Sequence, residues 1–443
     1  MQRLYRNEHL NFVKCRNEML FLCAVLVGSA WTIPPLSLED CVKMAKDRSL
    51  EMENARLSER TSEAALNASK TSRFPTFSAH VNQSLYDSPF NGKTQDHYRL
   101  SMGISGSYTL WDGGATGIDV ESKQLSLEAS KFETELSAIT VQESAMNAFV
   151  KLLAAKEARD VAYSAMELSD SLVLYHERFL EAGSITRSEL SLAKSDAASA
   201  KVKLISAEQT ERSAKTSLRQ ILEISRSDSL EILSPETSFE RPSDLGGIPP
   251  FETVLAETRK RYPGLISDSL KVLAAEKNLA LAGKNSSISV TLGADASTGF
   301  QAWESDRYGR QLKNGYTHSV TLGISIPLID GGTTQAKVLS AQVESERAEV
   351  ARRETGKNLE NSLEQLYMQA ESADASWLAA IASLESAQES FDVAVEQRKA
   401  GSLTFTDFLE QKNNLQNAQS VLIQAKYTSI LARKLLELYM GNF

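Results

Sequence analysis

Two Asp-Gly-Gly triplets are the residues whose types and spacing best suit the binding of a ligand. They are Asp112, Gly113 and Gly114 within LWDGG, and Asp330, Gly331 and Gly332 within LIDGG, 218 residues further along the chain. A glycine-rich turn before a helix can present free backbone amides to an anion. An aspartate there can instead cap the helix by accepting hydrogen bonds from the same amides. Because a strand-to-helix transition needs these residue types, we favour capping.

The remaining reactive side chains form no pattern typical of an enzyme. The histidines show no metal-ligand spacing; they are His9, His80, His97, His176 and His318. The sequence contains no phosphate-binding loop, no Cys-x-x-Cys pair and no nucleophile elbow. The net charge of −9 argues against a nucleic-acid-binding protein, which normally has a basic face. We therefore expect no enzyme activity, no cofactor, no bound metal and no nucleic-acid partner.

The N-terminal residues 1–30 resemble a secretory signal peptide. Basic residues precede a short apolar run over 19–27, and the small residues Gly28, Ser29 and Ala30 follow it. The nine apolar residues are too few for a membrane-spanning helix, which needs about 20 residues. Cleavage after Ala30 would leave Cys41 as the single cysteine. The bulky Leu22 disfavours lipidation at Cys23. We expect an exported protein without an internal disulfide.

The two triplets belong to a tandem duplication. When they are aligned, Ala182-Gly183-Ser184 falls on Ala400-Gly401-Ser402 without a gap, and Glu189 falls on Asp407. An ungapped match over this distance indicates an internal repeat. The sequence predicts a first repeat over residues 31–235, a linker over 236–248 and a second repeat over 249–443. The region around the linker is rich in Pro, Gly and Ser, as is typical of connecting segments.

Each repeat contains a very long segment without helix-breaking residues. Glycine is absent from 118–182 and from 184–245, and proline is absent from 90–234. A helix over 115–182 would span roughly 100 Å. Apolar residues recur every seven positions, as in a coiled coil: Leu125, Phe132, Ile139, Met146 and Leu153. Gly183 and Gly401 therefore mark the tips of two long helical hairpins. A soluble coiled-coil hairpin protein fits the helices equally well.

Four predicted strands point to a membrane. Residues 76–87, 97–111, 287–300 and 315–329 alternate apolar residues with mostly Ser, Thr and Gly. A transmembrane strand needs about 9–11 residues with this alternation. A soluble, half-buried sheet alternates in the same way. The export signal and the small polar positions favour the membrane interpretation. Because closure takes about eight strands, two or three copies would have to share one barrel.

In this organisation the chain resembles the outer-membrane efflux protein (TolC) family. The resemblance rests on a strand, an Asp-Gly-Gly triplet and a long helix occurring twice in order. It rests equally on the hairpin turns at 182–186 and 400–404, and it extends over roughly Leu36 to Met440. It implies an α+β membrane protein, a homotrimer with a twelve-stranded β-barrel in the outer membrane. Long coiled-coil-like helical hairpins would continue that barrel as a trimeric α-barrel through the periplasm.

The resemblance also implies a function and partners. Family members are exit ducts of tripartite efflux or type I secretion systems, passively exporting small molecules or proteins. They work with an inner-membrane pump and a periplasmic adaptor (membrane fusion) protein, and they contact outer-membrane lipid. The adaptor would grip the hairpin tips: Ala182, Gly183, Ser184, Ala400, Gly401, Ser402 and Leu403. The competing interpretation is a periplasmic adaptor or other coiled-coil protein, but an adaptor needs one hairpin flanked by compact β domains.

The resemblance assigns a pore constriction to acidic residues beyond the second tip. Asp407 and Glu410 match the family's pore-facing pair, and Glu189 is the first-repeat equivalent of Asp407. In a trimer the pair would form two rings of carboxylates, one helical turn apart. Acidic residues near a helix N-terminus also interact favourably with its dipole, and for Glu189 alone we favour that role. Some relatives lock this gate with an arginine where this chain has Leu403, so the resemblance does not extend to that lock.

Overall fold

A computed structural model describes residues 35–86, 97–225, 230–233, 240–301 and 306–441. The predicted signal peptide lies outside these residues. The chain divides into two compact units. The helical unit comprises residues up to 50, 140–248 and 366–438, and the sheet unit comprises 51–139, 249–365 and 439–443. Within the described ranges, none of the helices combines the length and the apolar character that a membrane crossing requires.

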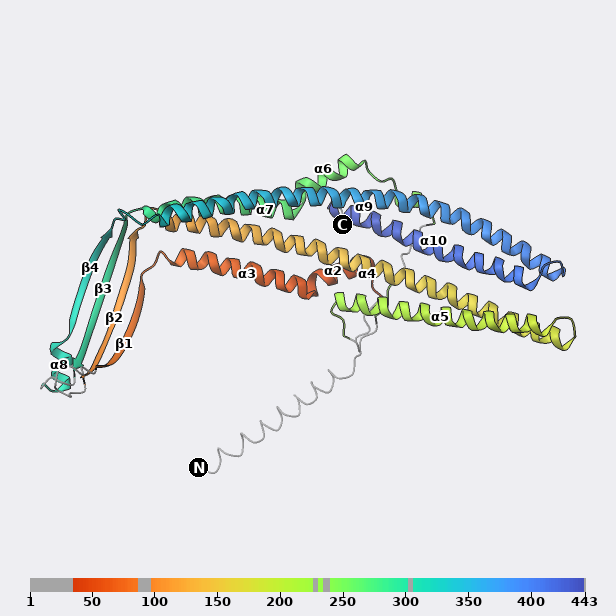
Figure 1. The fold of residues 1–443 in the computed structure, drawn as a ribbon, viewed down its shortest axis with the longest axis horizontal. Coiled ribbons are helices and arrows are strands. Elements are labelled where there is room, and N and C mark those ends of the chain that lie inside the picture. Colours follow the sequence, from red (N-terminus) through yellow and green to blue (C-terminus); the bar gives the residue numbers. More distant parts are fainter. Residues whose placement is uncertain (1–34, 87–96, 226–229, 234–239, 302–305, 442–443) are drawn as a thin grey trace, which may run out of the picture. The chain divides into compact units, whose positions relative to one another are not determined.

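The sheet unit contains one antiparallel sheet of four strands in the order β1-β2-β3-β4 (Figure 1). The strands are β1 (Thr76–Tyr86), β2 (His97–Trp111), β3 (Ser289–Gln301) and β4 (Thr317–Ser325). All four lie where the alternation predicts strands. β4 ends at Ser325, so the predicted end at residue 329 is wrong. Pro327 lacks the amide hydrogen that a sheet ladder uses, and the pairing with β3 stops at Ser289 opposite Ser325.

The strand register gives the sheet two chemically different faces. Phe77 pairs with Gly106, Gly106 with Ala294, and Ala294 with Val320, so one row crosses the sheet on its apolar face. The adjacent row on the polar face is Ser78, Ser105, Asp295 and Ser319. The apolar sheet face is largely exposed, with its most exposed side chains at Phe77, Val81, Leu85, Val320, Leu322 and Ile324. An apolar surface this continuous normally meets a partner or a membrane.

Helices precede and follow the strands of this sheet in the sequence. The sheet unit contains α3 (Leu50–Thr71), α6 (Phe251–Arg261), α7 (Pro263–Gly283), α8 (Tyr308–Asn314) and the first parts of α4 (Ala115–Glu181) and α9 (Thr333–Lys399). Polar contacts join these helices both between the repeats and within the second repeat. Ser122 donates a hydrogen bond to the side chain of Asn278 at 2.7 Å, and Thr355 donates to Asp268 at 2.6 Å. The N-terminal segments of both long helices are therefore packed in one unit with α7.

The helical unit contains the two predicted hairpins. The second part of α4 turns into α5 (Arg187–Ile221), and the second part of α9 turns into α10 (Phe405–Tyr439). α2 (Leu38–Arg48) belongs to the same unit and carries the buried, unpaired Cys41. Burial raises the pKa of this thiol to about 12. The predicted seven-residue seam packs inward in this unit, where Met146 and Leu153 are buried.

Candidate functional site: hairpin tips and strand-to-helix joints

The two hairpin tips have the same backbone geometry. Gly183 and Gly401 both have φ of +72°, a left-handed conformation that glycine adopts without strain. The amide of Ser184 donates to the Phe179 carbonyl at 2.9 Å, and that of Ser402 donates to the Gln397 carbonyl at 3.0 Å. These bonds close a Schellman motif at the end of each long helix. The prediction of turns at both glycines is confirmed.

The predicted tip contacts are mostly at the surface. Ala182, Gly183, Ser184, Ala400, Gly401 and Ser402 are exposed, and Leu403 is half-buried. Leu403 packs beside a buried cluster formed by Ala193, Ala394, Phe405 and Phe408. The tips are therefore accessible to a partner and supported by an apolar core directly behind them.

A threonine precedes the second helix of each hairpin and forms a hydrogen bond with an acidic residue three positions later. The hydroxyl of Thr186 accepts a hydrogen bond from the amide of Glu189 at 3.2 Å. The hydroxyl of Thr404 accepts from the amide of Asp407 at 3.2 Å and donates to its carboxylate at 2.6 Å. These are helix N-caps, and an acidic group three residues later also suits the helix dipole. The geometry gives Asp407 a capping role independent of any pore.

The three acidic candidates have different surroundings. Asp407 and Glu410 are exposed, on the side of α10 away from the buried Phe405 and Phe408. Glu189 is half-buried, and its carboxylate lies 3.8 Å from the guanidinium of Arg398. The structure therefore gives Glu189 a cationic partner on the other hairpin, while Asp407 and Glu410 lie together on an open helix surface.

Arg398 was not among the residues that the sequence singled out. Its guanidinium donates to the carbonyl of Leu403 at 3.1 Å and lies 5.5 Å from the centre of the Phe405 ring. Its one visible signal is a basic side chain in the last turn of α9, where the helix dipole alone would favour it. Arg398 joins the second tip to Glu189 on α5.

Lys412 is a second residue that the sequence did not identify. Its side chain is only 2% exposed and forms an ion pair with Asp196 of α5. It also donates a hydrogen bond to the hydroxyl of Ser169 of α4 at 2.6 Å. One cation thus connects α10 to both helices of the first hairpin. A charge so deeply buried is stable only when it is paired and hydrogen-bonded.

The two Asp-Gly-Gly triplets form matching joints in the sheet unit. Asp112 accepts from the amides of Gly114 at 3.0 Å and Thr116 at 2.7 Å, and Asp330 accepts from Gly332 at 3.0 Å and Thr334 at 2.7 Å. All four glycines have positive φ. At Gly113 a Cβ atom would lie 2.4 Å from the Ser287 Cβ, so no larger residue fits.

These hydrogen bonds also determine the charge state of the joints. Burial raises the pKa of Asp112, but the hydroxyl and amide of Thr116 and the amide of Gly114 more than offset it, leaving the pKa below its usual value. Hydrogen bonds from the Thr334 side chain and amide lower the pKa of Asp330 in the same way. Because the aspartates occupy the amides that an anion would need, capping is confirmed and an anion site is not supported.

Comparison with known proteins gives one family. The sequence profile of the family described as outer membrane efflux protein matches residues 41–222 and 254–442. The outer membrane efflux protein BepC of Brucella suis biovar 1 is 28% identical over 172 residues, which are 39% of this chain and 36% of that protein. The aligned region thus spans little more than a third of that relative.

Solved structures with low sequence identity share the fold. The Campylobacter jejuni CmeC outer membrane channel has a TM-score of 0.72 at 18% identity, covering 91% of this chain and 85% of that one. The open state of the Neisseria gonorrhoeae MtrE outer membrane channel has a TM-score of 0.71 at 17% identity, covering 91% and 88%. The arrangement of a small antiparallel sheet and long helical hairpins is therefore that of known outer membrane channels.

Proposed function

Because the chain belongs to the outer membrane efflux protein family, we propose that it is the exit duct of a tripartite efflux or type I secretion system. The duct would passively carry small molecules or proteins across the periplasm and outer membrane. The observation that carries this proposal is the two-faced sheet, whose exposed side is apolar and whose other side is lined by small polar residues. A lipid-facing pore wall needs this division.

The unpaired edges of the sheet support a homotrimer. β1 and β4 are the outer strands in the described sheet, so each has one edge without a neighbour in the subunit. An open edge cannot remain in lipid, because every backbone amide and carbonyl there must be hydrogen-bonded. Pairing β4 of one copy with β1 of the next would close three copies into a twelve-stranded β-barrel. The apolar sheet face would then point outward and the polar face would line the lumen.

The helical hairpins support a periplasmic role with an adaptor. Both tips are exposed, have the same backbone shape and are supported by a packed core. A periplasmic adaptor that links the duct to an inner-membrane pump would bind at these tips. The rival interpretation, that the chain is itself an adaptor, does not account for two equal hairpins with a four-stranded, two-faced sheet.

Asp407 and Glu410 would form the constriction in the assembled duct. Both carboxylates are exposed on one side of α10, where three copies would bring them into rings around the axis. Neighbouring carboxylates repel one another and attract cations, so such rings favour cation passage and bind divalent ions. Glu189 would contribute differently, because its charge is paired with Arg398 and would help hold the two tips together.

Reconstitution tests the function directly. The purified protein is expected to require detergent for extraction from the outer-membrane fraction. In a planar lipid bilayer it is expected to form trimers that conduct ions with a preference for cations, because the proposed constriction is acidic. Stoichiometry by mass measurement and reversal potentials in a salt gradient give the two readouts. A freely soluble monomer without conductance would overturn the duct proposal.

Removing both constriction carboxylates should change conduction. We expect Asp407→Ala combined with Glu410→Ala to raise single-channel conductance or to weaken the block by divalent cations, measured in the same bilayers. Thr404→Ala is the matched control, because it removes the helix cap at Asp407 and leaves both charges in place. If the double variant conducts and is blocked like the wild type, the two carboxylates do not form the constriction.

A further inference from the structure

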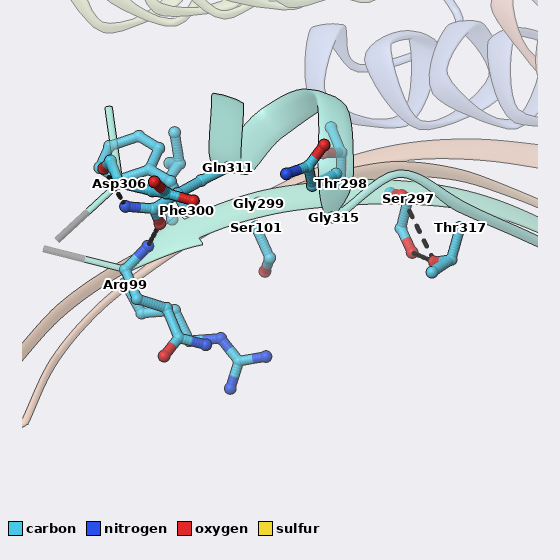
Figure 2. Close-up of a pocket in the computed structure, with 13 residues that line it drawn as sticks. Arg99, Ser101, Ser297, Thr298, Gly299, Phe300, Asp306, Gln311, Gly315 and Thr317 are labelled. Carbon is cyan, nitrogen blue, oxygen red and sulfur yellow. Dashed lines mark hydrogen bonds between the residues drawn. The ribbon is translucent and has the colours of Figure 1, made fainter. Parts of the chain in front are cut away.

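α8 lies against the apolar sheet face, at one end of the strands. The long helices join the sheet at the other end, where β1 begins at Thr76 and β2 ends at Trp111. Thr298 donates its hydroxyl hydrogen to the Leu312 carbonyl of α8 at 2.5 Å, and the Phe300 and Tyr308 rings are 4.6 Å apart. Register places Thr298 and Phe300 on the apolar face. α8 therefore covers that face (Figure 2), at the sheet end opposite the start of α4 (Figure 1).

Gln311 fixes α8 in this position. It is buried, its side-chain oxygen accepts from the amide of Gln301 at 2.7 Å, and its side-chain nitrogen donates to the Asp306 carbonyl at 2.8 Å. Gly315 ends the helix close to the sheet, because a Cβ atom there would lie 3.3 Å from the carbonyl oxygen of Gly299 in β3. The short helix is thus held by its own hydrogen bonds rather than by a partner.

The exposed surface of α8 is amphipathic. At roughly 100° per residue, Arg310 and Lys313 lie on one flank of the helix, while Tyr308 and Leu312 lie on the other. Arg307, Arg310 and Lys313 are all exposed. With Asp306 as the single acidic group between 306 and 314, the segment carries three positive charges and one negative charge. The Asp306–Arg310 pair at 3.2 Å is largely solvated and therefore weak.

We propose that α8, together with its N-cap residue Arg307, binds lipid, and that Arg307, Arg310 and Lys313 hold phosphate-bearing head groups of anionic lipid. This inference rests on the proposed function, because it requires the apolar sheet face to contact acyl chains. If acyl chains cover the apolar sheet face, their head groups lie beyond the ends of the strands. α8 lies at one of these ends. Guanidinium and ammonium groups bind phosphate oxygens strongly, and short helices with one apolar and one basic flank lie in the membrane interface.

The aromatic residues beside α8 are of the kind found at the boundary between acyl chains and head groups. Tyr98 and Tyr308 both contact Phe300, with ring centres 5.8 and 4.6 Å away. Rings with a polar tip concentrate where the apolar layer of a membrane meets its head groups. Three observations favour an anionic lipid as the ligand. They are the positive charge of the basic flank, its continuity with the exposed apolar face and the aromatic cluster.

Arg99 provides a matched control on the opposite side of the sheet. It pairs in register with Gln301, whose amide binds Gln311, so it lies at the same level as α8. Its side chain is exposed on the polar face and points away from α8 (Figure 2). Replacing Arg99 removes a positive charge at this level without removing one from the lipid side.

Lipid retention tests the proposal. Wild-type protein would be reconstituted in nanodiscs of equal parts phosphatidylcholine and phosphatidylglycerol, and the retained lipids counted by native mass spectrometry. The combined variant Arg307→Gln, Arg310→Gln and Lys313→Gln should retain phosphatidylglycerol on the order of a hundredfold less strongly, since three surface cations together contribute about 3 kcal/mol. Arg99→Gln should retain as much as the wild type. Circular dichroism should show the same secondary structure in all three proteins.

Three outcomes would overturn the proposal. They are equal retention by the wild type and the triple variant, an equal loss in Arg99→Gln, and displacement of the lipid by inorganic phosphate alone. Conductance, recorded on the same samples, tests the proposed duct function separately from the proposed lipid binding. A triple variant that conducts normally but loses anionic lipid supports both, whereas a wild type that retains the lipid without conducting refutes the duct alone.

Discussion

An arginine in place of Val320 should greatly reduce the amount of protein in the outer membrane. Val320 is 75% exposed on the apolar sheet face, where it pairs with Ala294 in the middle of β3. On the lipid side of a transmembrane sheet, an arginine near the bilayer midplane costs roughly 2–4 kcal/mol. A closed trimer would carry this cost in each of its three subunits. The measurement is the amount of detergent-extractable protein in the outer-membrane fraction relative to the total expressed.

Ser319→Arg is the control for this prediction. Ser319 is adjacent to Val320, but it lies on the polar face, where it pairs with Asp295. An arginine there would have an acidic neighbour and would face water in the lumen, so we expect near-normal membrane levels. If Val320→Arg reached the membrane as well as Ser319→Arg, the apolar face would not contact lipid. The sheet would then be a half-buried soluble sheet, the alternative that its alternation alone permits.

Replacing Lys412 with methionine should destabilise the helical unit by about 3–5 kcal/mol. Methionine fills a similar volume, but it leaves the Asp196 carboxylate without its cation, and that side chain is only 14% exposed. It also removes the donor to Ser169, so one substitution weakens contacts from α10 to both α4 and α5. The readout is the free energy of unfolding by guanidinium chloride, followed by circular dichroism in detergent.

The duplication supplies the control for Lys412. Lys194 is its equivalent in the first repeat, and it pairs with Glu177 at 2.9 Å but is 56% exposed. We expect Lys194→Met to cost less than about 1 kcal/mol. Combining Lys412→Met with Asp196→Leu should recover most of the lost stability, because no uncompensated charge remains. A Lys412→Met protein as stable as the wild type, or a double variant as unstable as the single one, would contradict a buried ion pair.

The sequence predicts the elements of this fold well, because its strongest signals are local. Gly183 and Gly401 interrupt long runs without breakers, and both are the turns that the structure contains. The Asp-Gly-Gly triplets cap helices, as residue type and position indicate. Alternation places the four strands, although the end of β4 depends on where its neighbour stops pairing, which a single strand cannot reveal.

The contacts between the hairpins are less accessible to sequence reasoning. Lys412 lies on the same face of α10 as the buried residues Phe405, Phe408 and Leu415. Helical spacing alone therefore indicates that a charged side chain is buried at this position. Its partner Asp196 lies on α5, more than 200 residues earlier, and nothing in the local sequence selects it. Arg398 is similar, since an arginine at a helix end usually remains in solvent. Helical periodicity identifies the buried face of a helix but not the neighbour that covers it.

The matching tips have a consequence for how this molecule can be recognised. Both turns have the same φ at glycine and the same Schellman bonds, yet Arg398 stands where the first repeat has Leu180. The two tips therefore share a backbone conformation but differ in the side chains around it. A partner that recognises the backbone conformation of the tip would have two equivalent binding sites on each chain. A partner that recognises the guanidinium of Arg398 would have one. Mutating one repeat at a time would show whether a partner recognises the backbone conformation or the Arg398 side chain.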